Sequence, residues 1–351
     1  MRHPVSDHTP RQMTRRAFMT AALGVSTTAL LAGCGRLIPS APTPRELPKV
    51  AVGYVPVLIS APLYIAQEKG YFREAGVAVE LKDLWQASEM LAGLAAGELQ
   101  GGTGGVGAAL MNAINRGLEV KLVAPLHSEK PPVATPLCVA KSLWEKGTVK
   151  KVADLKGKKV AINSKGSATE YWLAAALEKG GLGLRDIELQ TMPFPDAVTA
   201  MENGALEASM LSEPVATLGE RKGSTVRLSE DFINDFQVTA VYFTTKFISE
   251  NKAAGEAFVT GYLRAVRDLQ GDKYRAPENL TILEKYTKVP GDLIAASRLP
   301  FHDPEGKVRV EDFQKLHDFF MKEGSLNFKE PLNMAKLTEA SFAEAARKKL
   351  G

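Results

Sequence analysis

Short β-branched runs alternate with helix-like segments along this chain, and the alternation occurs twice. The first series has three strands and two helices, at 49–55, 63–70, 77–81, 87–97 and 120–124. A second series follows Leu137-Cys-Val-Ala, at 160–162, 170–179, 187–190, 197–203 and 208–211. A β-α-β-α-β order predicts a mostly parallel sheet with helices on its faces. The sequence therefore predicts an α/β protein with two lobes, and ligands favour the cleft between such lobes.

Residues 1–33 have the pattern of an export signal. Thr14-Arg-Arg-Ala-Phe-Met resembles the twin-arginine signal, although a general secretory signal can also contain paired arginines. The 19 uncharged residues that follow Arg16 are diluted by Thr, Ser and Gly, which argues against a membrane helix. Leu31-Ala-Gly-Cys resembles the lipobox of bacterial lipoproteins, so we expect Cys34 to carry a diacylglyceryl group. The alternative is an ordinary buried cysteine beside a secretory helix.

The segment 34–48 contains four prolines, which favour an extended, semi-rigid spacer. Together with a lipid on Cys34, this segment predicts a tether that holds the following body at the cell membrane, outside the cytoplasm. Residues 1–33 supply +3 of the net charge of +4, and the remainder has 40 basic against 39 acidic residues. A nearly neutral body lacks the positive electrostatic field that attracts a polyanion, so nucleic-acid binding is not expected.

The composition of the body gives catalysis and metal binding little support. Two cysteines, Cys34 and Cys138, are too few for a disulfide framework or a cysteine-rich metal site. Three histidines remain after removal of the signal, His127, His302 and His317, and their spacing fits no metal motif. The sequence lacks a nucleophile elbow and a P-loop. We therefore expect a protein that is not an enzyme and uses neither a cofactor nor a metal.

Several motifs follow one another in a characteristic order. They are Tyr54-Val-Pro, Tyr64-Ile-Ala-Gln-Glu-Lys-Gly-Tyr-Phe, Glu74-Ala-Gly-Val, Asp154-Leu-Lys-Gly-Lys-Lys-Val-Ala, Ala200-Met-Glu-Asn-Gly-Ala-Leu-Glu-Ala and Ser212-Glu-Pro. As an ordered set, spread over 49–271, they resemble the nitrate/sulfonate/taurine/thiamine-precursor family of substrate-binding proteins, which serve ABC importers and also include riboflavin binders. One departure is Gln100, where the family often has an acidic residue.

This resemblance implies a type II periplasmic-binding fold in which two hinge strands join the lobes. We place those strands near 136–140 and 238–243, so that one lobe comprises 49–136 plus 242–351 and the other 137–241. The implied partners are a small-molecule ligand, an ABC permease and its ATPase, and the protein is expected to be a monomer. An enzyme on the same fold and a ligand-sensing accessory protein are the competing classes.

Two polar turns are candidates for ligand binding. Gly102, Gly104 and Gly107 form a formal G-x-G-x-x-G, but this run does not open from the first strand as a dinucleotide fingerprint should. Glycines and helix-start amides at 108–112 can instead donate to ligand oxygens, and a purely structural turn is the alternative. Ser164-Lys-Gly-Ser-Ala-Thr is placed equivalently in the second lobe. We therefore expect the two turns to face each other.

The residue types near these turns favour a flat heterocycle, such as riboflavin or the thiamine pyrimidine. Aromatic side chains, hydroxyls and a carboxylate suit a neutral ring, whereas a small-anion pocket usually gathers Arg or Lys. An oxyanion such as a sulfonate, taurine, nitrate or bicarbonate is the alternative, since helix N-termini alone can bind anions. The expected roles are ring stacking by Tyr54 and Trp85, polar recognition by Thr103, Ser164, Ser167 and Glu213, and one wall of the cleft from Tyr242.

Overall fold

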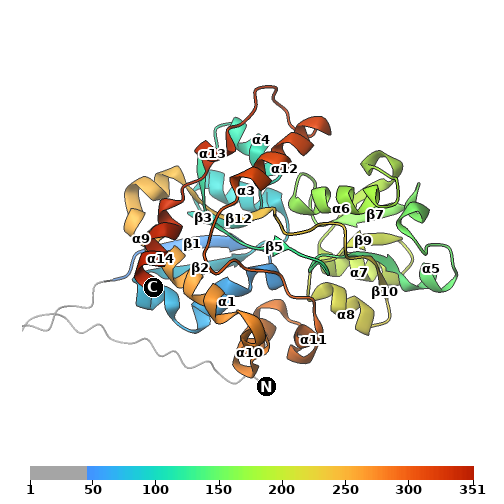
Figure 1. The fold of residues 1–351 in the computed structure, drawn as a ribbon, viewed down its shortest axis with the longest axis horizontal. Coiled ribbons are helices and arrows are strands. Elements are labelled where there is room, and N and C mark those ends of the chain that lie inside the picture. The colour runs from blue at the N-terminus through green and yellow to red at the C-terminus, as the bar shows by residue number, and fades with distance from the viewer. Residues whose placement is uncertain (1–45) are drawn as a thin grey trace, which may run out of the picture. The chain divides into compact units, whose positions relative to one another are not determined.

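Two five-stranded sheets organise residues 46–351, the part of the chain that this computed structural model describes (Figure 1). The expected export signal at 1–33, the lipidation site Cys34 and most of the tether lie outside the described residues. Each sheet is flanked by helices, as the alternating pattern predicts. We call the part built on the first sheet the first lobe and the part built on the second sheet the second lobe.

The first sheet has the strand order β2-β1-β3-β12-β4. Its strands are β1 (Lys49–Tyr54), β2 (Ala78–Asp83), β3 (Gly101–Gly105), β4 (Val120–Pro125) and β12 (Thr239–Thr244). β1 pairs in parallel with β2 and β3, and β12 runs antiparallel between β3 and β4. The carboxyl ends of β1, β2 and β3 therefore meet at one edge of this sheet.

The second sheet repeats this plan with the order β10-β6-β9-β7-β8. Its strands are β6 (Leu137–Ala140), β7 (Lys159–Ile162), β8 (Glu188–Thr191), β9 (Ala208–Met210) and β10 (Thr225–Ser229). β7 is parallel to β8 and β9, and β6 is antiparallel between β9 and β10. In each lobe, the strand that follows the crossing from the other lobe is thus the antiparallel one.

Helices cover both sheets and begin and end at identifiable residues. Those of the first lobe are α1 (Ala61–Glu68), α2 (Tyr71–Ala75), α3 (Ala87–Ala96), α4 (Ala108–Asn115), α9 (Thr245–Asp268), α10 (Pro277–Thr287), α11 (Gly291–Ala296), α12 (Val310–Lys322), α13 (Met334–Leu337) and α14 (Ser341–Leu350). Those of the second lobe are α5 (Lys141–Glu145), α6 (Ala168–Glu178), α7 (Phe194–Glu202) and α8 (Val215–Arg221). Single 3₁₀ turns lie at η1 (Leu58–Ser60), η2 (Val152–Leu155), η3 (Leu184–Asp186) and η4 (Gly271–Arg275). For example, α3 begins where Glu89 accepts from the Gln86 amide and ends at Gly97, whose φ of 76° suits a glycine.

The chain after β12 returns to the first lobe. The long helix α9 packs along α14, α2 and α1, so the carboxyl-terminal helices complete the core of this lobe (Figure 1). Within residues 46–351, no helix is both long and apolar enough to cross a bilayer.

The glycine-rich run that the sequence suggests is a turn is a buried strand, β3. Its glycines leave room for large neighbours, because a Cβ on Gly102 would lie 2.6 Å from the Met90 sulfur and 2.7 Å from the Tyr242 ring. A Cβ on Gly101 would likewise collide with the Phe243 ring. The strand is therefore specified by side chains that come from α3 and β12, which a local pattern does not reveal.

The hinge strands expected at 136–140 and 238–243 also need correction. β6 belongs wholly to the second sheet and β12 wholly to the first, where it begins before the expected lobe boundary at 242. The chain crosses between the sheets just before them, at 130–136 and 230–235. Beside these crossings, β5 (Ser128–Glu129) and β11 (Phe236–Gln237) pair as a separate two-stranded sheet. A β-branched run beside a lobe boundary resembles a hinge strand in the sequence, but β6 and β12 each form their strand hydrogen bonds within one sheet.

Candidate functional site between the lobes

The two polar turns predicted to face each other do meet across the lobes. The amide of Ala109, at the start of α4, donates to the carbonyl oxygen of Gly166 in the second lobe over 3.0 Å. Glycines make this approach possible: a Cβ on Gly105 would lie 2.6 Å from the Ala168 amide nitrogen, and one on Gly107 would collide with the Gly166 oxygen. The amino ends of α4 and α6 are therefore brought together at the carboxyl edge of the first sheet.

Two small cavities, of about 40 and 50 Å³, adjoin this contact and are lined by both lobes. Val55, Gly104 and Gly105 contribute from the first lobe, and Asn163 and Ser167 from the second. None of the lining residues is acidic, basic or a histidine. Pockets for drug-sized ligands have about 300–1,000 Å³. A ligand of vitamin size thus enters only if the lobes move apart.

Hydroxyl and amide groups order the second-lobe wall of these cavities. The Asn163 Oδ1 accepts from the Thr169 hydroxyl over 2.6 Å, and the Ser167 hydroxyl donates to the Ser164 carbonyl over 2.6 Å. Ser167 and Thr169 are themselves 2.7 Å apart. The Asn163 amide reaches the other lobe, where it donates to the Trp85 carbonyl over 3.4 Å. This wall is therefore held in place before any ligand is bound.

Trp172 completes the wall. It is 2 % exposed and its ring meets His127 edge-on, with ring centroids 5.6 Å apart. His127 is fixed in turn by the Thr239 hydroxyl at 2.7 Å and lies 3.4 Å from Glu129. Among residues 46–351, the indole Nε1–H has no hydrogen-bond acceptor. Trp172 and Thr239 both line the 40 Å³ cavity.

Five of the residues predicted from the sequence lie at or beside these cavities. Thr103, Ser167 and Tyr242 line them, and burial raises the pKa of Tyr242. Trp85 lies beside the 40 Å³ cavity, because it contacts two residues that line it. Its carbonyl accepts from the Asn163 amide, and its ring centroid lies 6.5 Å from that of Phe194. Ser164 supports Ser167 with its carbonyl.

Tyr54 is placed elsewhere, which corrects the predicted stacking role. Its ring meets Tyr64 at 5.3 Å and Tyr286 at 6.5 Å, in an aromatic cluster inside the first lobe. Burial, followed by the charge of Asp83, raises the pKa of Tyr54 to about 12. Tyr54 lines neither interlobe cavity. Its ring therefore faces α1, the helix that carries Tyr64.

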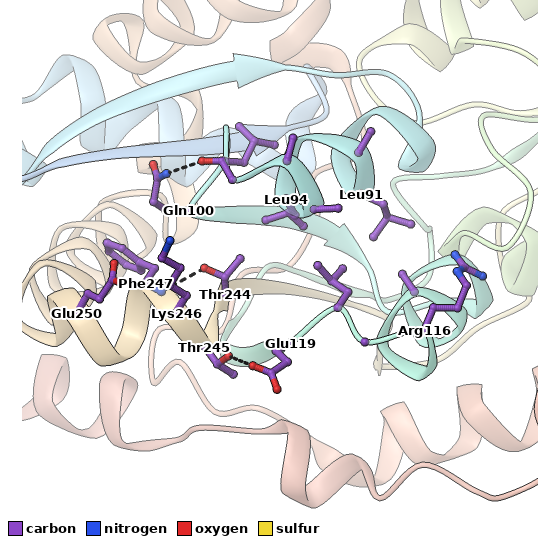
Figure 2. A pocket seen from close by; sticks show the side chains of 18 of the residues that line it. Leu91, Leu94, Gln100, Arg116, Glu119, Thr244, Thr245, Lys246, Phe247 and Glu250 are labelled. Carbon is purple, nitrogen blue, oxygen red and sulfur yellow. Dashed lines mark hydrogen bonds between the residues drawn. The ribbon is translucent and has the colours of Figure 1, made fainter.

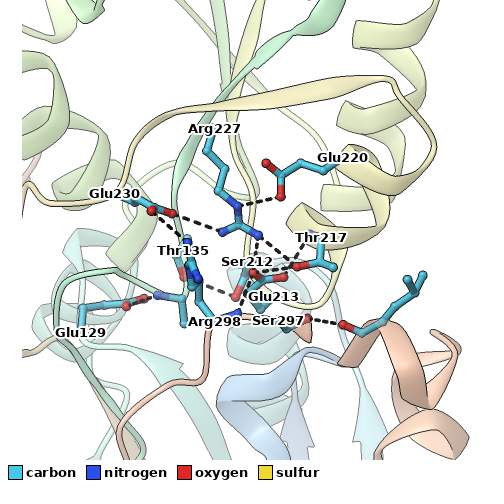
Figure 3. Close-up of polar contacts among 12 residues, drawn as sticks. Glu129, Thr135, Ser212, Glu213, Thr217, Glu220, Arg227, Glu230, Ser297 and Arg298 are labelled. Carbon is cyan, nitrogen blue, oxygen red and sulfur yellow. Dashed lines mark hydrogen bonds and ion pairs between the residues drawn. The ribbon is translucent and has the colours of Figure 1, made fainter. Parts of the chain in front are cut away.

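Glu213 also needs correction, because its carboxylate is fully engaged within the protein. It is 0 % exposed, and its Oε1 accepts from Arg227 Nη2 at 2.7 Å, the Thr217 hydroxyl at 3.0 Å and the Arg298 amide at 3.1 Å. Its Oε2 accepts from the Thr217 amide at 3.1 Å. Figure 3 shows this group, in which Arg298 comes from the first lobe and the others from the second. Glu213 thus joins the lobes, and its carboxylate oxygens have little remaining capacity to accept hydrogen bonds from a ligand.

The residues expected to contact a ligand do not include several that line the 40 Å³ cavity, namely Asn163, Thr169, Trp172, Phe194, Ser212 and Thr239. Thr169 and Trp172 were within reach, since they follow the Ser164-Lys-Gly-Ser turn directly. Phe194 and Thr239 carry no local signal, because only the packing of the lobes brings them to the same cavity.

A larger groove of about 960 Å³ lies on the first lobe, at the amino-terminal edge of its parallel strands (Figure 2). It is lined by the first lobe alone, including Leu91, Arg116 and Lys246. Gln100, the departure from the family pattern, lies here: its Oε1 accepts from the Ala51 amide over 2.8 Å and its Nε2 donates to the Gly97 carbonyl over 3.2 Å. Since ligands of α/β sheets bind at the carboxyl edge, we do not assign ligand capture to this groove.

The two-lobed fold is that of the substrate-binding proteins. The described chain superposes on the alkanesulfonate-binding protein SsuA from Xanthomonas axonopodis pv. citri, bound to MOPS, with a TM-score of 0.70 and 18% identity, over 84% of this chain and 99% of that one. This similarity confirms the fold predicted from the sequence.

A model of the NMT1-like family matches residues 43–283, so the chain belongs to the NMT1-like family. It is 27% identical over 263 residues to the riboflavin-binding protein RibY of Chloroflexus aurantiacus, covering 70% of this chain and 72% of that protein. It is 24% identical over 236 residues to the nitrate/nitrite binding protein NrtA of Nostoc sp., covering 63% of this chain and 53% of that protein. The resemblance indicated by the sequence motifs is thereby confirmed.

Proposed function

We propose that this protein is an extracytoplasmic solute-binding lipoprotein of an ABC importer, which captures a flat heterocyclic ligand between its lobes and delivers it to a permease. The observation that carries the proposal is the pair of interlobe cavities, lined by hydroxyls and aromatic rings from both lobes and by no charged side chain. Buried aromatic and hydrogen-bonding groups suit a neutral ring. Riboflavin and the thiamine pyrimidine are the leading candidates, and a relative is named a riboflavin-binding protein.

The proposed cycle uses the motion of the lobes. The crossings at 130–136 and 230–235 act as the hinge, the ligand enters while the lobes are apart, and the glycine turns come together over it. Binding without turnover is part of this proposal. An enzyme on the same fold and a ligand-sensing accessory protein are the competing classes.

An oxyanion is the second candidate ligand. Relatives are named for nitrate and aliphatic sulfonates, and the amino ends of α4 and α6 meet at the cavities. Backbone amides at helix starts bind anions without any arginine.

A ligand panel tests the proposal. The purified protein is first analysed for any copurified molecule by its absorption spectrum, then titrated with riboflavin, the thiamine pyrimidine, taurine, MOPS and nitrate by thermal shift and calorimetry. We expect stabilisation by riboflavin or the pyrimidine. Stabilisation by the anions alone would replace the heterocycle with an oxyanion, and turnover of a bound compound would favour an enzyme. A permease and an ATPase encoded beside this protein would favour an importer over a sensor.

A further inference from the structure

We infer that the interlobe cavities select an uncharged ligand, with Trp172 donating to an acceptor on the ligand and Glu170 disfavouring oxyanions, an assignment that rests on the proposed function. Both residues belong to the first turns of α6, the helix whose amino end adjoins the cavities.

The indole of Trp172 is a buried donor that lacks an acceptor. Trp172 is 2 % exposed and lines the 40 Å³ cavity, and no described residue accepts a hydrogen bond from its Nε1–H. Buried donors are almost always hydrogen-bonded in folded proteins, so an unpaired one calls for an explanation. An edge-on contact with the His127 ring helps to hold the indole in place. A carbonyl oxygen or ring nitrogen of a ligand in this cavity would supply the acceptor.

The amino end of α6 would by itself attract an anion. Ala168 and Thr169 begin the helix and line the same cavity, and the first amides of a helix carry a partial positive charge. In this helix, however, a carboxylate is already present. Glu170 is 3 % exposed and accepts from the amide of Gly166, which lines the second cavity. An anion bound here would share the helix end with a buried negative charge, and such repulsion is strong where water is excluded.

Nothing among the lining residues offsets this repulsion, since none of them is Arg, Lys or His. Lys165, in the same turn, is exposed to water and compensates only part of this charge, while Glu323 of the first lobe adds negative charge beside Glu170. A neutral flavin or pyrimidine offers acceptors to Trp172 without introducing a charge. The arrangement thus favours the heterocycle over the sulfonate or nitrate.

The test of Glu170 compares two variants of one helix. E170Q removes the buried charge but keeps an acceptor for the Gly166 amide, and E178Q removes an exposed charge from the last turn of α6. Burial raises the pKa of Glu170, so MOPS, nitrate and riboflavin are titrated at pH 8. We expect E170Q to bind MOPS or nitrate at least about tenfold more tightly than the wild type, with E178Q within about twofold. Equal anion affinities in E170Q and the wild type would overturn the role of Glu170.

The test of Trp172 uses W172F, with W144F on the half-buried α5 tryptophan as the matched control. W172F is expected to weaken riboflavin binding by about tenfold, because the ligand loses its donor, while the melting temperature of the ligand-free protein is maintained. Wild-type affinity in W172F would overturn the role of Trp172. Should the wild type bind no riboflavin at all, the proposed heterocycle would be wrong, and the comparison of E170Q with E178Q would still decide whether Glu170 disfavours anions.

Discussion

One buried carboxylate that resembles a ligand contact in the sequence instead joins parts of the fold. This carboxylate, that of Glu213, collects donors from Arg227, Thr217 and the Arg298 amide and so connects α8, β10 and the segment after α11 (Figure 3). A glutamate before a proline at a strand end looks like a ligand acceptor in the sequence. Its partners are 4, 14 and 85 residues away, so only the fold reveals that its capacity is used.

Replacing Glu213 by Gln should therefore lower stability first. The substitution removes the buried counter-charge of Arg227, whose side chain is 12% exposed, although Glu220 and Glu230 still pair with this arginine, so we expect a cost of about 1–3 kcal/mol. Urea unfolding of the ligand-free protein measures this loss. The matched control is Glu220→Gln, which removes a partly exposed partner of the same arginine and should cost less than about 1 kcal/mol. Equal stabilities of the Glu213 variant and the wild type would contradict this account.

His302 should make stability depend on pH. It is 3 % exposed, donates from Nδ1 to the Leu126 carbonyl over 2.7 Å and stacks on Tyr274, and burial lowers its pKa to about 3. The unfolded chain binds a proton below about pH 6.5, whereas the folded chain does not until about pH 3. Stability is thus fully present above about pH 6.5 and falls by about 1.4 kcal/mol per pH unit below it.

The variant His302→Asn keeps a donor for the Leu126 carbonyl and removes the titrating ring. Urea unfolding at pH 7, 6 and 5 should give a slope that is shallower than the wild-type slope by about 1 kcal/mol per pH unit on average, since the unfolded histidine is only partly protonated near pH 6.5. All other carboxylates and histidines are present in both proteins. The difference between the two slopes therefore reports the titration of His302 alone. Parallel slopes would show that His302 takes up a proton as readily in the folded protein as in the unfolded chain, and would contradict the lowered pKa.

At the scale of elements, the alternating pattern predicted most strands and helices because period and composition are local properties. Strand β3 escaped prediction, since Gly101-Gly-Thr-Gly-Gly has the composition of a turn and becomes a strand only against Met90, Tyr242 and Phe243. The position of the crossings was not predicted for a similar reason. β6 and β12 differ from hinge strands only in the strands with which they pair, which the local sequence does not show.

The glycine turns should control how closely the lobes approach. Gly107 has a φ of −106°, which any residue can adopt, so a methyl group there does not strain its own turn. The methyl group would instead collide with the Gly166 carbonyl of the other lobe. Gly107→Ala should therefore hold the lobes apart, raise the radius of gyration in solution scattering and weaken ligand binding by about tenfold or more.

Gly183→Ala is the matched control for this variant. Gly183 lies in the second lobe, its φ is −122°, and the nearest atom to an added Cβ would be 3.9 Å away. This variant should scatter and bind like the wild type. If Gly107→Ala gave the same scattering curve as Gly183→Ala, the glycine contact would not limit the approach of the lobes.

For the molecule as a whole, motif order was sufficient to predict the family and the two-lobed fold, and the facing of the two polar turns followed from their equivalent places in the lobes. The composition of the site was predicted less completely. Thr103, Ser167 and Tyr242 line the cavities, whereas Tyr54 and Glu213 are used inside the protein. A sequence shows which residues follow a strand, but it does not show toward which face of the sheet each side chain points. Which residues reach the surface between the lobes depends on this orientation.

The last prediction concerns how the whole protein is held in place. If Cys34 is the acylated first residue of the mature chain, as the lipobox-like Leu31-Ala-Gly-Cys indicates, the protein should partition into the detergent phase of a Triton X-114 separation. Two or more acyl chains, at about 0.8 kcal/mol per buried methylene, make such anchoring durable. Cys34→Ala should remove the thiol that carries the lipid and leave an unprocessed or freely released protein. Cys138→Ala is the control. Cys138 is fully buried in β6, so this substitution should leave the partition into detergent unchanged. Mass spectrometry that found an unmodified Cys34 thiol in the membrane fraction would contradict the anchor.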